Sequence, residues 1–223
     1  MTTYFALKLA EPVQQRIDEL LRNLDARVAA PQHDLHTQVS IELSDEIMRL
    51  CVDELIGRFQ AGGEGEGAGV LHTLLGLLKS TSHMLIRQML GKTGNDDVNR
   101  MAQYLRDRRL VLGGVTYCGF EVPAEMAARF DQAFAAVAAG EGEPLRGEIQ
   151  KTMLAFSDLA LGRYYDDFVT PMNLGFIKRK ASDLGRATIS KGTHVAVNKL
   201  FPTLRQKELS VWANYFSTLF VKA

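Results

Sequence analysis

The sequence predicts a mainly α-helical fold: a multi-helix, bundle-like domain with one small β-hairpin at about residues 110–122 and a short N-terminal strand. Apolar residues recur with the helical period of 3.6 through most of the 223 residues. The period changes to two only near the hairpin, where Gly113 and Gly114 supply the positive φ angles of a tight turn. Hydrophobic residues make up 46% and charged residues 23% of the chain, which is typical of a globular protein.

The N-terminal part of the chain is expected to contain one strand and two helices. Alternating side chains over Tyr4–Leu9 indicate the strand, and Pro12 fits the first turn of the helix that follows. Ser44 is a good N-cap and is followed by two acidic residues, so we expect the second helix to begin there and to end at Gly62.

The glycine-rich segment 62–67 contains no apolar side chain and is expected to be a flexible connection. It predicts a boundary between an acidic helical segment, 1–61, and a main helical domain, 68–223. A single domain over 1–223 is the alternative that this pattern leaves open.

The remainder of the chain continues in helices on both sides of the hairpin. The stretch Gly175–Phe201 is ambiguous, because two glycines flank a β-branched run that suits either a helix or a strand. Further helices are expected over Val70–Leu90, Asp96–Arg109, Pro123–Gly140, Leu145–Phe168 and Thr203–Val221.

Positive charge is concentrated at the C-terminal end, although the whole chain carries no net charge. Residues 172–223 contain nine basic and two acidic residues, and hydroxyl side chains lie between the basic ones. Such a segment suits an acidic partner or an anionic ligand. The residues expected to bind it are Lys178, Arg179, Lys180, Arg186, Lys191 and Lys199. The first hypothesis is therefore a non-catalytic, cytoplasmic regulatory or interaction protein.

A winged-helix-like nucleic-acid-binding protein is the main alternative, because a polar helix is followed directly by a hairpin, as a recognition helix is followed by its wing. The side chains that would contact nucleic acid are Asn99, Arg100, Gln103, Arg106 and Arg109. The acidic residues Asp96, Asp97 and Asp107 weaken the positive field of the same helix.

Catalysis has no positive support in the sequence, so no catalytic residue or cofactor is assigned. A nucleophile elbow, a dinucleotide fingerprint and a phosphate loop are all absent. An enzyme acting on an anionic small molecule remains a second alternative. His33 and His36 are too few to hold a metal and are expected in a solvated loop, so no metal site is expected.

Neither a membrane partner nor a secreted location is expected. The most apolar stretch, Val70–Leu90, is interrupted by charged and polar residues, and the N-terminus lacks a basic leader. Cys51 and Cys118 have no metal-site or redox spacing and are expected to be buried thiols. These features favour a cytoplasmic location.

The final expected helix has an apolar arc of about 200°, about twice the width that a surface helix needs. Half of this arc would have to pack on a second surface, which favours a homodimer with the helix at a two-fold contact. The interface residues expected there are Trp212, Tyr215, Phe216 and Phe220.

Overall fold

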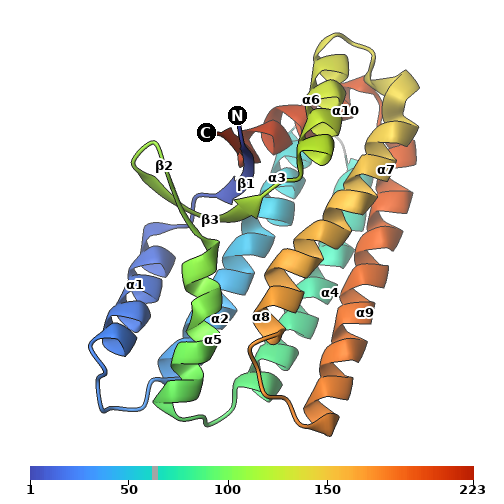
Figure 1. Ribbon diagram of the computed structural model, residues 1–223. Coiled ribbons are helices and arrows are strands. Elements are labelled where there is room, and N and C mark those ends of the chain that lie inside the picture. The colour runs from blue at the N-terminus through green and yellow to red at the C-terminus, as the bar shows by residue number, and fades with distance from the viewer. Residues whose placement is uncertain (62–64) are drawn as a thin grey trace.

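The computed structural model describes residues 1–61 and 65–223, with only the backbone described at 65–67. It is mainly α-helical, with one small antiparallel sheet close to residues 1 and 223 (Figure 1). The helices are α1 (Glu11–Asp25), α2 (His33–Met48), α3 (Glu54–Ala61), α4 (Gly65–Leu90), α5 (Asn95–Arg108), α6 (Ala124–Ala138), α7 (Gly142–Leu161), α8 (Asp167–Val169), α9 (Phe176–Leu200) and α10 (Gln206–Phe216). The strands are β1 (Thr3–Leu7), β2 (Arg109–Leu112), β3 (Val115–Glu121) and β4 (Phe220–Lys222).

The sheet has the strand order β2-β3-β1-β4, and all of its pairs are antiparallel. The expected hairpin and N-terminal strand are both present, and Gly113 and Gly114 take φ angles of 56° and 81° at the turn. Phe5 of β1 lies opposite Phe120 of β3 on one side and Phe220 of β4 on the other. These aromatic side chains close one end of the helical bundle.

The helices α2, α4, α7 and α9 pack side by side in the bundle (Figure 1). The most extensive contact is between α4 and α9. The stretch that the sequence leaves ambiguous is one continuous helix, α9. Its glycines are contact points: a Cβ on Gly185 would lie 2.3 Å from Leu85 Cδ1, and one on Gly192 would lie 2.3 Å from Leu77 Cδ2. A side chain at either position would force these leucines or the helices to shift. The two glycines therefore serve close helix packing, although in the sequence they resemble turn signals.

Two expected boundaries are wrong. Ser44 lies inside α2, which begins at His33, because the preceding residues already fit the helix and bury His36 to 1% exposure. His33 and His36 are therefore helical and not part of a loop. The last helix ends at Phe216, and the chain then turns into β4, where pairing with β1 satisfies its backbone.

One apolar core joins the parts of the chain on both sides of the glycine-rich segment. It contains Leu20 and Phe59 from before the segment, and Leu71 and Leu90 from after it. The flexible connection is expected over residues 62–67, of which 62–64 lie outside the described residues. The expectation is wrong for residues 65–67, whose backbone already belongs to α4.

Candidate functional site

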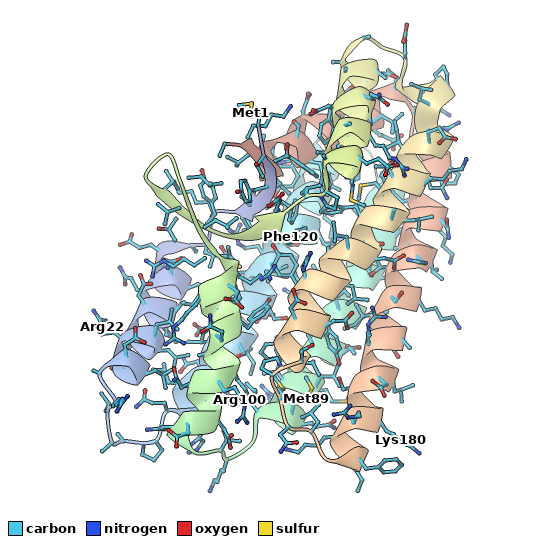
Figure 2. The ribbon with its side chains drawn as sticks, in the orientation of Figure 1. Met1, Arg22, Met89, Arg100, Phe120 and Lys180 are labelled. Atoms are coloured by element: carbon cyan, nitrogen blue, oxygen red, sulfur yellow. The ribbon has the colours of Figure 1, made fainter. Side chains whose placement is uncertain are left out.

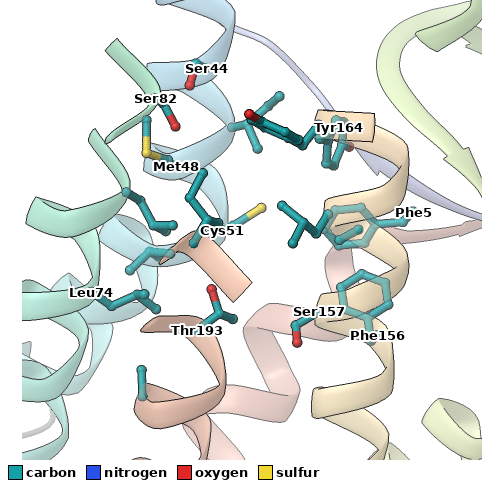
Figure 3. Close-up of a pocket in the computed structure, with 18 of the residues that line it drawn as sticks. Phe5, Ser44, Met48, Cys51, Leu74, Ser82, Phe156, Ser157, Tyr164 and Thr193 are labelled. Carbon is teal, nitrogen blue, oxygen red and sulfur yellow. The ribbon is translucent and has the colours of Figure 1, made fainter. Parts of the chain in front are cut away.

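An apolar cavity of about 280 Å³ lies between α2, α4, α7 and α9. Its walls are formed by side chains such as Met48 from α2, Leu74 from α4, Phe156 from α7 and Thr193 from α9 (Figure 3). Cores normally pack at crystal density and contain few voids larger than a water molecule. A void of this size is therefore a feature to be explained.

The cavity is elongated along the helices. Leu71 and Met89 both line it from α4, and their separation corresponds to about 27 Å along a helix axis. Phe201 and Trp212 lie on its wall where α9 and α10 meet. At the other end of the bundle it is lined by Phe168 of α8 and by Met89 near the end of α4. The space thus runs most of the length of the bundle.

The lining is almost entirely aliphatic and aromatic. Among the described residues that line it, none is an Asp, Glu, Lys, Arg or His. The polar exceptions are small hydroxyl groups, and those of Ser44, Ser82 and Thr193 form no hydrogen bond with a described residue. Figure 3 shows Ser44 and Ser82 near one another, with Thr193 and Ser157 farther along the wall.

Two larger polar groups on lining residues are buried without a hydrogen-bond partner among the described residues. These are Tyr164 Oη and Trp212 Nε1. Leaving such a donor unpaired costs about 1–3 kcal/mol, so structures usually avoid it. Burial raises the pKa of Tyr164 well above its usual value, so this hydroxyl remains protonated at neutral pH.

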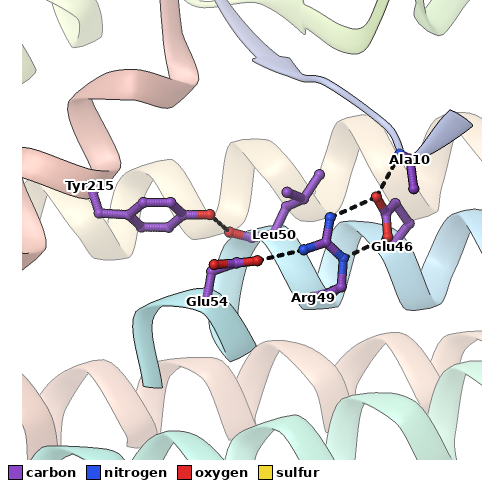
Figure 4. A network of polar contacts seen from close by, with 6 residues as sticks. All are labelled: Ala10, Glu46, Arg49, Leu50, Glu54 and Tyr215. Carbon is purple, nitrogen blue, oxygen red and sulfur yellow. Dashed lines mark hydrogen bonds and ion pairs between the residues drawn. The ribbon is translucent and has the colours of Figure 1, made fainter. Parts of the chain in front are cut away.

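A π-helical turn, Arg49–Asp53, joins α2 to α3 and places Cys51 and Val52 on the cavity wall. Glu46 holds this turn by accepting hydrogen bonds from Ala10 N and from Arg49 Nε, each at 2.8 Å (Figure 4). Arg49 also pairs with Glu54 beyond the turn, at 2.5 Å. The Arg49 guanidinium holds the pKa of Glu46 below its usual value and so keeps this carboxylate charged.

A second π-helical turn, Gly162–Asp166, continues α7 and places Tyr164 and Tyr165 on the same cavity. Each π turn accepts a tyrosine hydroxyl on a backbone carbonyl: Tyr215 Oη donates to Leu50 O, and Tyr104 Oη donates to Tyr164 O. π-Helical turns are uncommon and occur frequently at functional sites. Two of them lining one cavity mark it as the candidate site.

Three side-chain pairs join neighbouring wall helices. Asp45 of α2 contacts His83 of α4 at 2.8 Å, and Asp158 of α7 contacts His194 of α9 at 2.8 Å. Asp166 of the second π turn accepts two hydrogen bonds from Arg186 of α9, at 2.6 and 2.7 Å. These pairs hold the helices around the void although the void itself contributes no packing.

The basic residues expected to bind an anion all lie on α9 but point in several directions. Arg186 is paired with Asp166, and Lys178 Nζ donates to the carbonyl of Met89 at 3.3 Å. Lys180 lies over the ring of Phe176, 4.4 Å from its centroid. The others, Arg179, Lys191 and Lys199, are exposed. None of the six lines the cavity, and their binding of a partner stays a prediction.

The residues expected to contact nucleic acid are on or beside α5 and have contacts within the chain. Arg100 pairs with Asp97, Arg106 with Asp25 and Arg109 with Asp18. Gln103 bonds to Asp107, and Asn99 accepts a hydrogen bond from Arg106. Nucleic-acid binding also stays a prediction. The three arginines expected to contact nucleic acid are paired with carboxylates of the same chain.

The aromatic side chains of α10 are buried within their own chain. The expectation that half of this apolar face must pack on a second surface is therefore wrong. Trp212 is 1% exposed, and Tyr215 and Phe216 are buried as well. Phe220 is half-buried in β4 and packs on Phe130. Trp212 and Phe216 line the cavity. The homodimer stays a prediction without this argument.

Sequence reasoning did not identify the cavity residues. Their apolar spacing is the same as that of a packed helical core. The one feature that differs from such a core is that the hydroxyl residues Ser44, Ser82 and Thr193 occupy positions facing inward. The comparisons with protein-family models, with curated proteins and with solved structures found no match for this chain. None of the described helices has the length and apolar character needed to cross a bilayer.

Proposed function

We propose that the protein binds one elongated, apolar small molecule in the cavity between α2, α4, α7 and α9, as a carrier or sensor of that molecule. The single observation that carries this proposal is the void itself, about 280 Å³ and lined without a charged side chain. An unfilled apolar cavity forfeits dispersion contacts on all of its walls. A bound hydrocarbon would restore those contacts.

The shape of the cavity favours a chain-like ligand, such as an acyl or isoprenoid chain. A compact ring system would use only part of a space that extends over about five turns of α4. Apolar pockets of this kind bury most of a ligand's surface and orient it with a few polar groups. Ser44, Ser82 and Thr193 provide such groups for an uncharged oxygen on the ligand.

A charged head group does not suit the interior. The lining offers no cation to a carboxylate or phosphate, and an isolated buried ion is strongly disfavoured. The ligand is therefore uncharged, or its charged end stays outside the cavity.

Thermal unfolding with added ligand tests the proposal. A long-chain alcohol should raise the melting temperature in a saturable way, because a ligand that binds only the folded state adds about 2.7 kcal/mol at a concentration of 100 Kd. A short-chain alcohol at the same concentration should have little effect. The absence of stabilisation by any long-chain alcohol or hydrocarbon would contradict the proposal.

A cavity-filling substitution provides the specific control. Ala160 lines the cavity from α7, so Ala160→Phe should occupy the space and reduce ligand stabilisation. Ala135 lies exposed on α6, and Ala135→Phe adds the same side chain without changing the cavity. The first variant should lose the ligand response, and the second should keep it.

The function expected from the sequence, binding of an acidic partner by the basic residues of α9, remains a proposal beside this one. Arg179 favours it, because this exposed cation has no ion pair with a described residue.

A further inference from the structure

We propose that the first nine residues of α9, Phe176–Leu184, dock the protein on an anionic lipid surface and place one end of the cavity against the bilayer. This surface is called the α9 tip below. Its role in ligand exchange rests on the proposed function, whereas the docking itself does not. The proposal also identifies the acidic partner that the basic C-terminal segment would recognise.

The apolar part of the α9 tip is unusually exposed. Phe176, Ile177 and Leu184 are 71%, 82% and 70% exposed, more than any other large apolar side chain described except Met1. Single exposed apolar residues are ordinary, but three within nine residues form a patch that suggests a binding surface. A side chain inserted into a bilayer interface would regain the apolar contact that it lacks here.

The same segment carries cations where a helix least favours them. Lys178, Arg179 and Lys180 occupy the N-terminal turns of α9, whose first turn contains no acidic residue. The positive end of the helix dipole disfavours cations at this place. Among the described residues none of the three has a carboxylate partner, so an external anion would relieve the repulsion.

Apolar and basic residues alternate on the outward face of the tip. At 100° per residue, Phe176, Lys180 and Leu184 lie on one side of α9, opposite Gly185, which packs on α4. Lys180 also covers the ring of Phe176. Aromatic and aliphatic groups that enter the acyl boundary, beside lysines that reach the head groups, are typical of helices that lie at a membrane surface. A nucleic acid would use the cations but leave Ile177 and Leu184 in water.

The α9 tip adjoins one end of the cavity. Lys178 Nζ bonds to the carbonyl of Met89, and Met89 lines the cavity. Gly185, directly after the tip, packs on Leu85, another lining residue. Figure 2 places Met89 and Lys180 at the same end of the molecule. A protein docked through this tip would hold its apolar cavity end-on to the acyl chains from which a ligand could enter.

Co-sedimentation of the full chain with vesicles tests the docking. The protein should sediment with vesicles of phosphatidylcholine and phosphatidylserine but not with phosphatidylcholine alone, and added salt should weaken the association. Arg179→Glu with Lys180→Glu should weaken binding about tenfold or more, since each basic residue near an anionic membrane contributes about fivefold in affinity. Phe176→Ser with Ile177→Ser should also weaken it, which pure charge attraction would not explain.

Lys8→Glu with Arg22→Glu is the matched control. Both cations are exposed and have no described ion pair, and the change in net charge is identical. Because they lie away from the α9 tip, vesicle binding should stay within about twofold of wild type. Lys178 is left unchanged in every variant, because it contacts the end of α4.

The outcomes separate docking from ligand binding. Ala160→Phe should keep vesicle association while it loses the response to a long-chain alcohol, so either proposal can fail alone. Failure to sediment with anionic vesicles, equal sedimentation with neutral ones, or an equal loss in the control variant would overturn the docking proposal. Retained binding after Phe176→Ser with Ile177→Ser would also overturn it.

Discussion

The hydroxyl of Tyr215 in α10 donates a hydrogen bond to the carbonyl of Leu50 inside the first π turn. This contact connects the C-terminal helix to the turn that places Cys51 on the cavity wall. The Tyr215 ring also lies under Arg58, whose guanidinium carbon is 4.5 Å from the ring centroid. Burial raises the pKa of Tyr215 to about 12, so its hydroxyl remains a donor over the physiological range.

Tyr215→Phe should therefore destabilise the fold by about 1–2 kcal/mol, because the Leu50 carbonyl loses its partner while the ring is kept. Urea unfolding followed by circular dichroism measures this change. Tyr117→Phe is the control, since the Tyr117 hydroxyl has no hydrogen bond with a described residue. Equal destabilisation by both substitutions would show that the Leu50 contact has no special role.

Acid stability should depend on His36. This residue is 1% exposed, and burial lowers its pKa from 6.5 to about 4. It is neutral in the folded state but takes up a proton near pH 6.5 when the chain unfolds. Its contribution to the free energy of unfolding is therefore complete above pH 6.5. This contribution falls by about 3 kcal/mol in total as the pH decreases toward 4.

The free energy of unfolding, measured between pH 4 and 7, tests this dependence. His36→Leu should flatten the slope over that interval, whereas His72→Leu, at an exposed position of α4, should leave it unchanged. Arg49 lowers the pKa of Glu46 from its usual value of 4.5. This carboxylate therefore changes the stability only below about pH 4.5, outside most of the measured interval. An unaltered slope in His36→Leu would refute the assignment.

The close approach of α4 and α9 should make Gly185 intolerant of any side chain. Gly185→Ala would place its methyl group 2.3 Å from Leu85 Cδ1, and moving the helices apart should cost about 1–3 kcal/mol. Gly147 lies exposed within α7 with no atom near its Cβ position, so Gly147→Ala should stabilise by about 0.5–1 kcal/mol. Opposite signs in thermal unfolding are expected, and stabilisation by Gly185→Ala would contradict the packing.

The two free thiols should react slowly in the native protein. Burial raises the pKa of Cys51 and of Cys118 to about 12, so at pH 8 only about one thiol in ten thousand is ionised. In Cys118→Ser, alkylation of Cys51 should be slow and become rapid in denaturant. Rapid labelling of Cys51 in the folded protein would show that the cavity wall is open to water.

The periodicity of the sequence was sufficient to predict the fold class, the hairpin and the N-terminal strand, since each depends on local patterns such as Gly113-Gly114. It misplaced the start of α2 because Ser44 satisfies the chemistry of an N-cap while tertiary packing continues the helix through it. It left α9 ambiguous because Gly185 and Gly192 suggest turns and in fact contact α4. Local signals cannot distinguish these cases.

The candidate site was not predictable in the same way. Leu71, Leu85 and Phe156 have the spacing of core residues, and no local signal tells a packed core from a hollow one. The π turns that help to form the wall depend on distant partners, such as Tyr215 for Leu50. The broad apolar face of the last helix is visible in the sequence and favours a dimer contact there. In the structure this face closes the bundle and lines its cavity.

Trp212 can report directly on a ligand in the cavity, because it is the single tryptophan of the chain and it lines the cavity. A long-chain alcohol with two bromine atoms near the middle of its chain should quench Trp212 fluorescence by contact, in a saturable titration that ends at one ligand per protein. The unbrominated alcohol should compete with it, and Ala160→Phe should abolish the quenching while Ala135→Phe retains it. Unsaturable quenching, or quenching that persists unchanged in Ala160→Phe, would contradict a ligand site in the cavity.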